Sequence, residues 1–250
     1  MRRLVLMSLT VLVGAGCISL GVWQATRLGE RRASNTAARA GVALPPLVAD
    51  SAVAPRLLPY RRAVLTGVLD PSQEFVLRNH LVRGVPAVQI ITPLRIPGID
   101  SAVLVNRGYV PAPDAVDPGS AEWAEPGTRI FQGTLLPVPD RGDGTPIRRG
   151  ERETWKRLDL AAMRARLPYP VAPVYLMVRP NPGEGNAHTL SGTVYPFRAE
   201  LPPMDEGPHL MYAIQWFGIA AAVLAFGAMF ILKRRPSGRT AQTSAVDGAW

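Results

Sequence analysis

The chain has 250 residues, one cysteine, three histidines and a formal net charge of +9. One cysteine excludes a disulfide framework and a Cys-rich zinc site, and three histidines leave little for a multi-histidine metal centre. Charged residues make up only 19% of the sequence and hydrophobic residues 47%, whereas a typical soluble domain is about 25% charged. This deficit of charge indicates membrane segments.

The positive charge is concentrated at the two ends of the chain. Residues 1–32 carry five arginines and one glutamate, a net +4, and residues 208–250 carry a net +3. Residues 33–207 carry the remaining +2, with 19 basic and 17 acidic side chains. A basic chain is a candidate for nucleic-acid binding, but the near-neutral middle segment argues against it. We therefore expect no nucleic-acid partner.

Two uncharged stretches are long enough to cross a bilayer. They run from Leu4 to Trp23 and from Leu210 to Leu232. A helix rises about 1.5 Å per residue, so roughly 20 residues span a hydrocarbon core of about 30 Å. We predict transmembrane helices at residues 4–23 and 209–232.

Basic residues predict the orientation of these spans. Arg2 and Arg3 precede the first span and Lys233–Arg235 follow the second, and such residues favour the cytoplasmic side. The arginines at positions 27–32 oppose this locally, but a connection of about 190 residues is long enough to escape the rule. We therefore expect a bacterial inner-membrane protein with both termini in the cytoplasm, a periplasmic domain and the lipid bilayer as a partner.

The N-terminus has three alternative interpretations: a cleaved signal peptide, a lipoprotein site at Cys17 and a mitochondrial transit peptide. The apolar run continues past Gly14 to Trp23, longer than the apolar core of a signal peptide. Gly14 also stands where a lipoprotein site usually has leucine. An amphipathic Arg/Ser-rich leader is absent from the sequence. These observations favour an uncleaved span.

Between the spans the sequence predicts a linker followed by a β-rich domain. Residues 24–59, rich in alanine and proline from residue 33 onward, are interpreted as the linker, and residues 60–208 as the extracytoplasmic domain. Strand-like runs occur at residues 60–69, 74–78, 85–94, 102–110, 130–136 and 174–178. Short strands separated by Pro, Gly and Asp clusters favour a mainly antiparallel barrel or sandwich.

Other segments complete the predicted organisation. Asp159 has the position of an N-cap for one short helix that stops at Pro168. Residues 181–208 are expected to be irregular, and residues 233–250 to form a polar cytoplasmic tail. The predicted fold class is a membrane protein in which two transmembrane α-helices flank a mainly antiparallel β domain containing one short helix.

Catalytic signatures are absent from the sequence. It contains no nucleophile elbow, phosphate-binding loop, HExxH or CxxC motif. His80 and His188 are isolated and are interpreted as surface residues in a turn and a loop. We expect no catalytic residues and no enzymatic activity.

His209 is the candidate metal ligand. On a helix beginning there, Tyr212 and Trp216 share its face, together with the small residues Ala213 and Ala220. Alanines leave room for a ligand, aromatic rings supply stacking area, and a neutral imidazole is a good iron ligand. An ionisable group at membrane depth is a functional hypothesis by default. The alternative is an interfacial histidine that faces lipid headgroups.

The first span contributes further candidate ligand-binding residues at the membrane depth of His209. In an antiparallel arrangement Trp23, Gln24 and Arg27 lie near His209. The Arg27 guanidinium is suited to pair with porphyrin carboxylates or, alternatively, with a lipid headgroup. Small residues four apart, which would let the helices approach closely, occur at Cys17 and Gly21 and at Gly218 and Ala222.

Five motifs occur in order along the chain. They are G-x-W-Q-x-x-R at residues 21–27, a strand at 60–67, Arg78 with Gly84 and Ile91–Leu94, V-N-R-G-Y-V-P at 105–111, and the helix start at 208–217. Together they resemble the surfeit-locus family of cytochrome c oxidase assembly factors (the Surf-one/Shy-one family), from about residue 20 to 232. Ala87 and Tyr109 depart from the glycine and tryptophan common in that family.

The resemblance implies a non-enzymatic role in maturing cytochrome c oxidase. It implies transient binding of haem a and delivery to oxidase subunit 1, with haem a synthase as a further possible partner. A histidine at the start of the second helix is associated with haem binding in bacterial relatives, and His209 matches it. The predicted haem-contacting residues are His209, Tyr212, Trp216, Trp23, Gln24 and Arg27, with His209 on the metal.

The resemblance leaves the role of Asn106, Arg107 and Gly108 open. We interpret them as a strand end turning toward the membrane, in which Gly108 adopts an unusual backbone angle and Arg107 pairs with a buried acid or a lipid. The main alternative function is a haem-independent membrane scaffold that docks oxidase subunits through its external β domain. A two-span sensor is disfavoured, because a tail of 18 residues is too short for a signalling domain.

Overall fold

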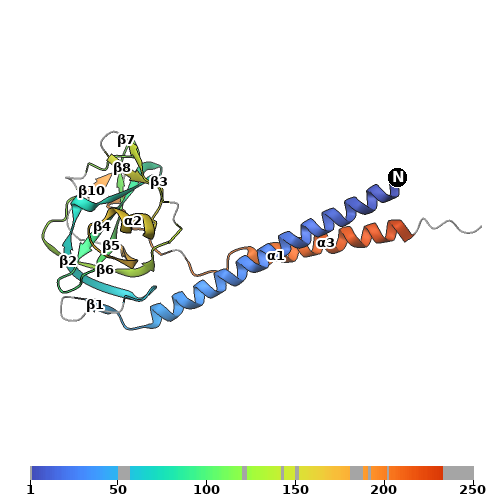
Figure 1. The fold of residues 1–250 in the computed structure, drawn as a ribbon, viewed down its shortest axis with the longest axis horizontal. Helices are drawn as coiled ribbons and strands as arrows, with labels where there is room; N and C mark the ends of the chain where they lie inside the picture. Colours follow the sequence, from blue (N-terminus) through green and yellow to red (C-terminus); the bar gives the residue numbers. More distant parts are fainter. Residues whose placement is uncertain are drawn as a thin grey trace, which may run out of the picture. The chain divides into compact units, whose positions relative to one another are not determined.

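The chain forms two compact units, residues 1–34 with 205–250 and residues 35–204. The first unit is a pair of helices and the second is a β domain (Figure 1). The computed structural model describes residues 2–49, 57–119, 123–141, 144–149, 152–180, 188–190, 193–201 and 203–232. The predicted tail at 233–250 lies outside the described residues.

Two long helices make up the first unit. They are α1 (Arg2–Ala43), whose last turns belong to the β domain, and α3 (His209–Leu232). Both are long and apolar enough to cross a membrane. The structure confirms the predicted helix at residues 209–232, whereas α1 extends well beyond the predicted span of residues 4–23.

The predicted linker at residues 24–59 is wrong in its first half, because α1 continues without a break to Ala43. Residues 24–43 contain no proline and are rich in alanine and arginine, which are good helix formers. The helix ends just before Pro45 and Pro46, and proline disfavours helical backbone in the residue that precedes it.

A row of buried and partly buried residues joins α1 to α3, and we call it the helix seam. On α1 it contains Gly14, Cys17, Gly21, Gln24 and Leu28. On α3 it contains His209, Ala213, Trp216, Ala220, Val223 and Gly227. Alternating steps of three and four residues average 3.5, the repeat of helices that pack along a continuous left-handed seam.

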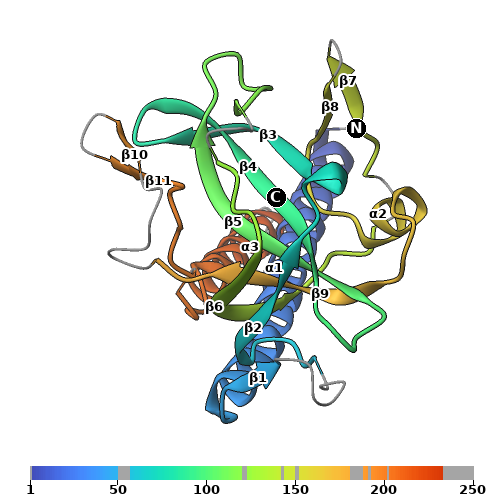
Figure 2. The same ribbon diagram turned by 90° about the vertical axis from the view of Figure 1, so that its left-hand side faces the viewer.

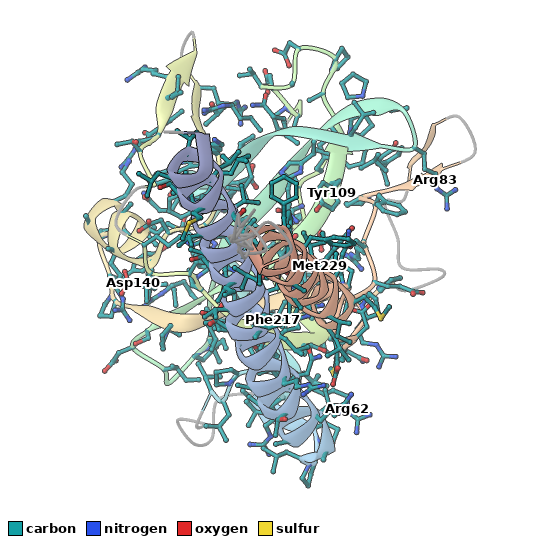
Figure 3. The ribbon with its side chains drawn as sticks, turned by 90° about the vertical axis from the view of Figure 1, so that its right-hand side faces the viewer. Arg62, Arg83, Tyr109, Asp140, Phe217 and Met229 are labelled. Atoms are coloured by element: carbon teal, nitrogen blue, oxygen red, sulfur yellow. The ribbon has the colours of Figure 1, made fainter. Side chains whose placement is uncertain are left out.

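The two helices approach closely along the helix seam. A Cβ atom at Gly21 would lie 2.7 Å from the ring of Phe217, which Figure 3 labels on α3. The expected contribution of Cys17 and Gly21 to close packing is confirmed. The expected contribution of Gly218 and Ala222 is wrong, since the space around Gly218 is open and Ala222 is exposed. Spacing by four residues does not say which face of a helix is covered.

The side chains of both helices suit an apolar solvent. The hydroxyls of Thr10, Ser19 and Thr26 donate hydrogen bonds to the carbonyl four residues earlier, at 2.9, 2.9 and 3.0 Å. Polar groups in hydrocarbon must be satisfied inside the protein in this way. Large apolar side chains cover the outer faces, among them Leu12 on α1 and Phe226 on α3, which are 71% and 67% exposed.

Five strands form the centre of the β domain: β2 (Arg62–Leu69), β4 (Val85–Arg95), β5 (Ala102–Pro111), β6 (Thr128–Pro137) and β9 (Val171–Val178). They pair in the order β2, β6, β9, β5, β4, and β4 pairs again with β2 where Val68 meets Arg95. This cycle of pairings gives a barrel-like sheet (Figure 2). Only the β5–β9 pair in the cycle is parallel, so the predicted mainly antiparallel domain is confirmed.

The remaining elements lie outside this cycle of pairings. They are β1 (Leu47–Ala49), the 3-10 helix η1 (Pro71–Gln73), β3 (Phe75–Val82), β7 (Ile147–Arg149), β8 (Arg152–Trp155), α2 (Leu160–Arg166), β10 (His188–Leu190) and β11 (Thr193–Tyr195). The six predicted strands are present, but β1, β7, β8, β10 and β11 were not predicted. Strands of three or four residues are too short to show an alternating pattern. The hairpin of β10 and β11 also corrects the expectation that residues 181–208 are irregular.

Three apolar clusters lie in the described part of the domain, and two of them explain its central packing. Side chains from all five central strands fill the barrel interior, among them Leu65, Leu94, Val103, Leu135 and Leu176, all fully buried. A second cluster packs α2 onto the sheet. The predicted cap of α2 is confirmed, since the Asp159 carboxylate accepts a hydrogen bond from the Ala162 N–H at 3.1 Å.

Candidate functional site

The structure joins two of the predicted site residues directly. Gln24 lies on the helix seam of α1 and is only 9% exposed, and His209 is the first residue of α3. The imidazole Nδ1 of His209 lies 2.8 Å from the amide Oε1 of Gln24. In the tautomer protonated at Nδ1, the ring donates this proton to the amide oxygen of Gln24. Nε2 then keeps its lone pair and can bind a metal.

Gly207 leaves space beside the ring of His209. Its φ is +66°, a left-handed conformation that favours glycine. A Cβ atom at this position would lie 3.6 Å from Cδ2 and 3.8 Å from Nε2 of His209. Sequence reasoning missed Gly207, although a Gly-Pro pair directly before a helix is a signal for such a turn.

Trp23 and Arg27 contact each other on the exposed side of α1. The Arg27 guanidinium carbon lies 6.0 Å from the centroid of the Trp23 ring. The same guanidinium forms an ion pair with Glu30 at 2.8 Å. The carboxylate beside Arg27 is therefore supplied by α1 itself, whereas the sequence analysis expected a porphyrin or a headgroup to supply it.

The predicted face of α3 is largely covered by α1. Trp216 is partly buried in the helix seam, and Ala213 and Ala220 are 6% and 3% exposed. These alanines allow close helix packing, so the expectation that they leave room for a ligand is wrong. Tyr212 lies outside the seam and is 47% exposed.

The six predicted contact residues therefore fall into separate groups. Gln24 and His209 are hydrogen-bonded, and Trp23 and Arg27 form a cation–π contact. Across the part of the chain that the structure describes, no hydrogen bond or ion pair connects Tyr212 or Trp216 with either group. The Gln24–His209 pair is the part of the predicted site in which a hydrogen bond joins α1 to α3.

A second constellation lies inside the β domain, where Arg107 is 3% exposed. Its guanidinium forms ion pairs with Glu74 and Glu125, each at 3.1 Å, and donates to the Trp123 carbonyl. Thr92 donates a hydrogen bond to Glu74 at 2.9 Å. Burial raises the pKa of the Glu74 carboxyl, and the positive charge of Arg107 opposes this shift. This confirms the expected pairing of Arg107 with a buried acid.

A β-bulge directs Arg107 into this cluster. On the partner strand Ile90 lies opposite Gly108 and Ile91 opposite Asn106, so Arg107 is the extra residue of β5. Gly108 has a φ of +113°, as expected, and donates its N–H to the Asn106 side chain at 3.0 Å. The motif lies inside a strand, so the interpretation as a strand end is wrong.

The other two histidines differ from the expectation of surface turns and loops. His80 lies in β3, is partly buried and packs edge-on against Tyr109 with ring centroids 5.0 Å apart. The Tyr109 position is labelled in Figure 3. His188 lies in β10, and its side chain is outside the described residues.

The chain is similar in sequence to known proteins over most of its length. A sequence profile of the SURF1 family matches residues 11–221. A SURF1-like protein of Monosiga brevicollis is 26% identical over 237 residues, covering 88% of this chain and 84% of its own. A SURF1-like protein of Rickettsia felis is 24% identical over 237 residues, covering 92% of this chain and 95% of its own. The expected resemblance is confirmed, and the chain belongs to the SURF1 family, known generally as cytochrome c oxidase assembly factors.

Proposed function

We propose that the chain is a membrane-bound assembly factor for cytochrome c oxidase that binds haem a transiently and assists its insertion into the catalytic subunit. Family membership supports the role in oxidase assembly. The hydrogen bond between His209 and Gln24 is the observation that carries the haem part of the proposal.

The chemistry of this pair suits a haem ligand. A metal-binding histidine commonly donates its second ring nitrogen to a neighbouring acceptor, which fixes the tautomer and the orientation of the ring. Gln24 is such an acceptor, and Gly207 is a neighbour on the Nε2 side of the ring, where even an added Cβ atom would lie 3.8 Å from Nε2. Haem would supply the iron when bound, and the His209 imidazole would hold it.

We place the protein in a bacterial inner membrane, with both termini in the cytoplasm and the β domain on the periplasmic side. The exposed apolar faces of α1 and α3 and the satisfied hydroxyls of Thr10, Ser19 and Thr26 support insertion. Lys233–Arg235 support the orientation through the excess of positive charge on cytoplasmic segments.

In this proposal the protein binds and releases haem and catalyses no reaction. Its partners are oxidase subunit 1, which receives the haem, and the enzyme that makes haem a. Complementation of a deletion strain with wild type or with His209→Ala tests the proposed function. We expect the deletion to lower oxidase activity and haem a content, wild type to restore both, and His209→Ala to restore neither. Normal oxidase in the deletion strain would contradict an assembly role.

A haem-independent scaffold is the second candidate function. It is favoured by the close packing of the helix seam, where Ala213 and Ala220 are covered by α1. In that case a variant that carries no haem, such as His209→Ala, would still restore oxidase assembly. The same complementation therefore separates the two functions.

A further inference from the structure

Two arginines of α1 bind the segment that leads into α3. Arg31 donates from Nε to the Asp205 carbonyl at 3.0 Å, and its guanidinium lies 3.5 Å from the Asp205 carboxylate. Arg32 binds Glu206 through two parallel hydrogen bonds of 2.8 Å each. We call Arg31, Arg32, Asp205 and Glu206 the ionic latch.

The ionic latch adjoins the candidate haem ligand in the sequence. Glu206 is followed by Gly207, which has a φ of +66°, and then by Pro208. The Pro208 carbonyl accepts the N–H of Tyr212 at 3.1 Å, a hydrogen bond of the first turn of α3. Only two residues therefore separate the bidentate ion pair from His209, so the position of Glu206 restricts where the imidazole can lie.

The ionic latch also follows the helix seam on α1. Arg31 is seven residues after Gln24, two helical turns along, so the two side chains leave the helix on nearly the same side. One end of this segment binds the turn before α3, and the other end binds the ring of His209. Two attachments on one face fix the register of the two helices.

The ion pairs are suited to positioning rather than to stabilising the fold. Their side chains are between 42% and 62% exposed, and exposed ion pairs contribute little to stability. A bidentate Arg–carboxylate pair nevertheless has a fixed geometry. Such a pair therefore favours one arrangement of the turn while contributing little to the free energy of unfolding. Because the pair is exposed, added salt weakens it.

We infer that the ionic latch is a positioning device for His209, which keeps Nδ1 on Gln24 and Nε2 toward Gly207. Arg31 and Arg32 are thus positioning residues for the ligand. The inference rests on the proposed function only in assigning Nε2 to iron. It also explains the arginines that oppose the expected orientation of the first span: Arg31 and Arg32 are matched by acids that precede α3.

The first test needs no haem. Full-length protein labelled with ¹⁵N-histidine is studied in detergent micelles at pH 8, and His209→Ala identifies the resonances of that ring. We expect the Nδ1-protonated tautomer in wild type, a shift toward the Nε2-protonated tautomer in Arg32→Glu, and its reversal when Glu206→Arg is added. Arg166→Glu is the matched control, because Arg166 pairs with Glu153 inside the β domain, and it should leave the tautomer unchanged.

The second test uses protein loaded with haem. We expect Arg32→Glu to lower haem affinity at least tenfold, as loss of an orienting partner typically does, and the charge-swapped double variant to recover it. An unchanged tautomer in Arg32→Glu, or a folded double variant that does not recover the wild-type tautomer, overturns the inference whether or not the protein binds haem. A wild type without haem overturns the proposed function and leaves the tautomer test of the ionic latch intact.

Discussion

The imidazole of His209 and the amide of Gln24 are 185 positions apart in the sequence and 2.8 Å apart in the structure. Each side chain fixes the other, because the amide oxygen accepts the Nδ1 proton and Nε2 remains available. The pair lies at one end of the helix seam, so its geometry depends on how closely α1 and α3 pack.

Replacing Gln24 tests the role of the hydrogen bond. Gln24→Leu removes the acceptor while keeping a side chain of similar size, and we expect haem affinity to fall by about 10- to 100-fold. Haem titration of the full-length protein in detergent measures the effect. Ser19→Ala is the control, since Ser19 bonds to its own helix. Equal affinities of Gln24→Leu and wild type would show that the bond does not orient a ligand.

Close packing of the helix seam predicts different effects at two glycines of α1. Gly21→Val places methyl groups against Phe217, and overpacking of this kind costs about 1–3 kcal/mol. Gly16→Val is the control, because a Cβ atom there meets no neighbour within 4 Å. Unfolding of the full-length protein in mixed micelles measures the change in stability that each substitution causes. A greater loss of stability in Gly16→Val would contradict the described seam.

The buried cluster around Arg107 predicts a large loss of stability. Arg107→Met leaves Glu74 and Glu125 without their cation, and breaking a buried ion pair costs about 3–5 kcal/mol. Burial already raises the pKa of Glu74. A raised pKa means that the folded state keeps the Glu74 proton up to a higher pH than the unfolded chain does. The stability contributed by this protonation is therefore lost as pH rises through the pKa of the folded state.

Denaturant unfolding at two pH values checks this prediction. We expect the loss caused by Arg107→Met to be smaller at pH 5 than at pH 8, because a protonated Glu74 needs no cation. Glu74→Gln in the Arg107→Met background should reduce the difference between the two pH values. A loss that is the same at both would exclude Glu74 as the titrating group.

His80 predicts a loss of stability on acidification. Burial lowers the pKa of its imidazole below the ordinary value of about 6.5. The unfolded chain therefore binds a proton more readily than the folded chain, and stability present above about pH 6.5 falls as pH drops toward the folded pKa. His80→Gln should be less sensitive between pH 7 and pH 5 in denaturant unfolding. An unchanged pH dependence would exclude His80 as a contributor.

The sequence predicted those features that rest on long patterns or single strong signals. The apolar run at residues 209–232 gave a helix with the observed bounds, and the Asp159 cap was recognised because an acidic residue preceded an apolar-periodic segment. The six longer strands were found for the same reason. The helix beyond residue 23 was missed because its alanine-rich composition was interpreted together with the prolines that follow.

Features that depend on pairing across the chain could not be predicted. The bulge at Arg107 follows from its register against β4, and the contacts of Arg31 and Arg32 join residues 174 positions apart. His209 and Gln24 were both chosen as candidates, but the hydrogen bond between them required the register of the two helices. The same register shows that Ala213 and Ala220 are covered.

The central claim is that His209 is the haem ligand, and the optical spectrum of bound haem tests it most directly. Full-length wild type and His209→Ala are purified in detergent from cells that make haem a, and spectra are recorded with and without added imidazole. We expect a histidine-ligated spectrum in wild type, loss or change of that spectrum in His209→Ala, and recovery with imidazole. Equal haem content and identical spectra in the two proteins, without a response to imidazole, would contradict the claim.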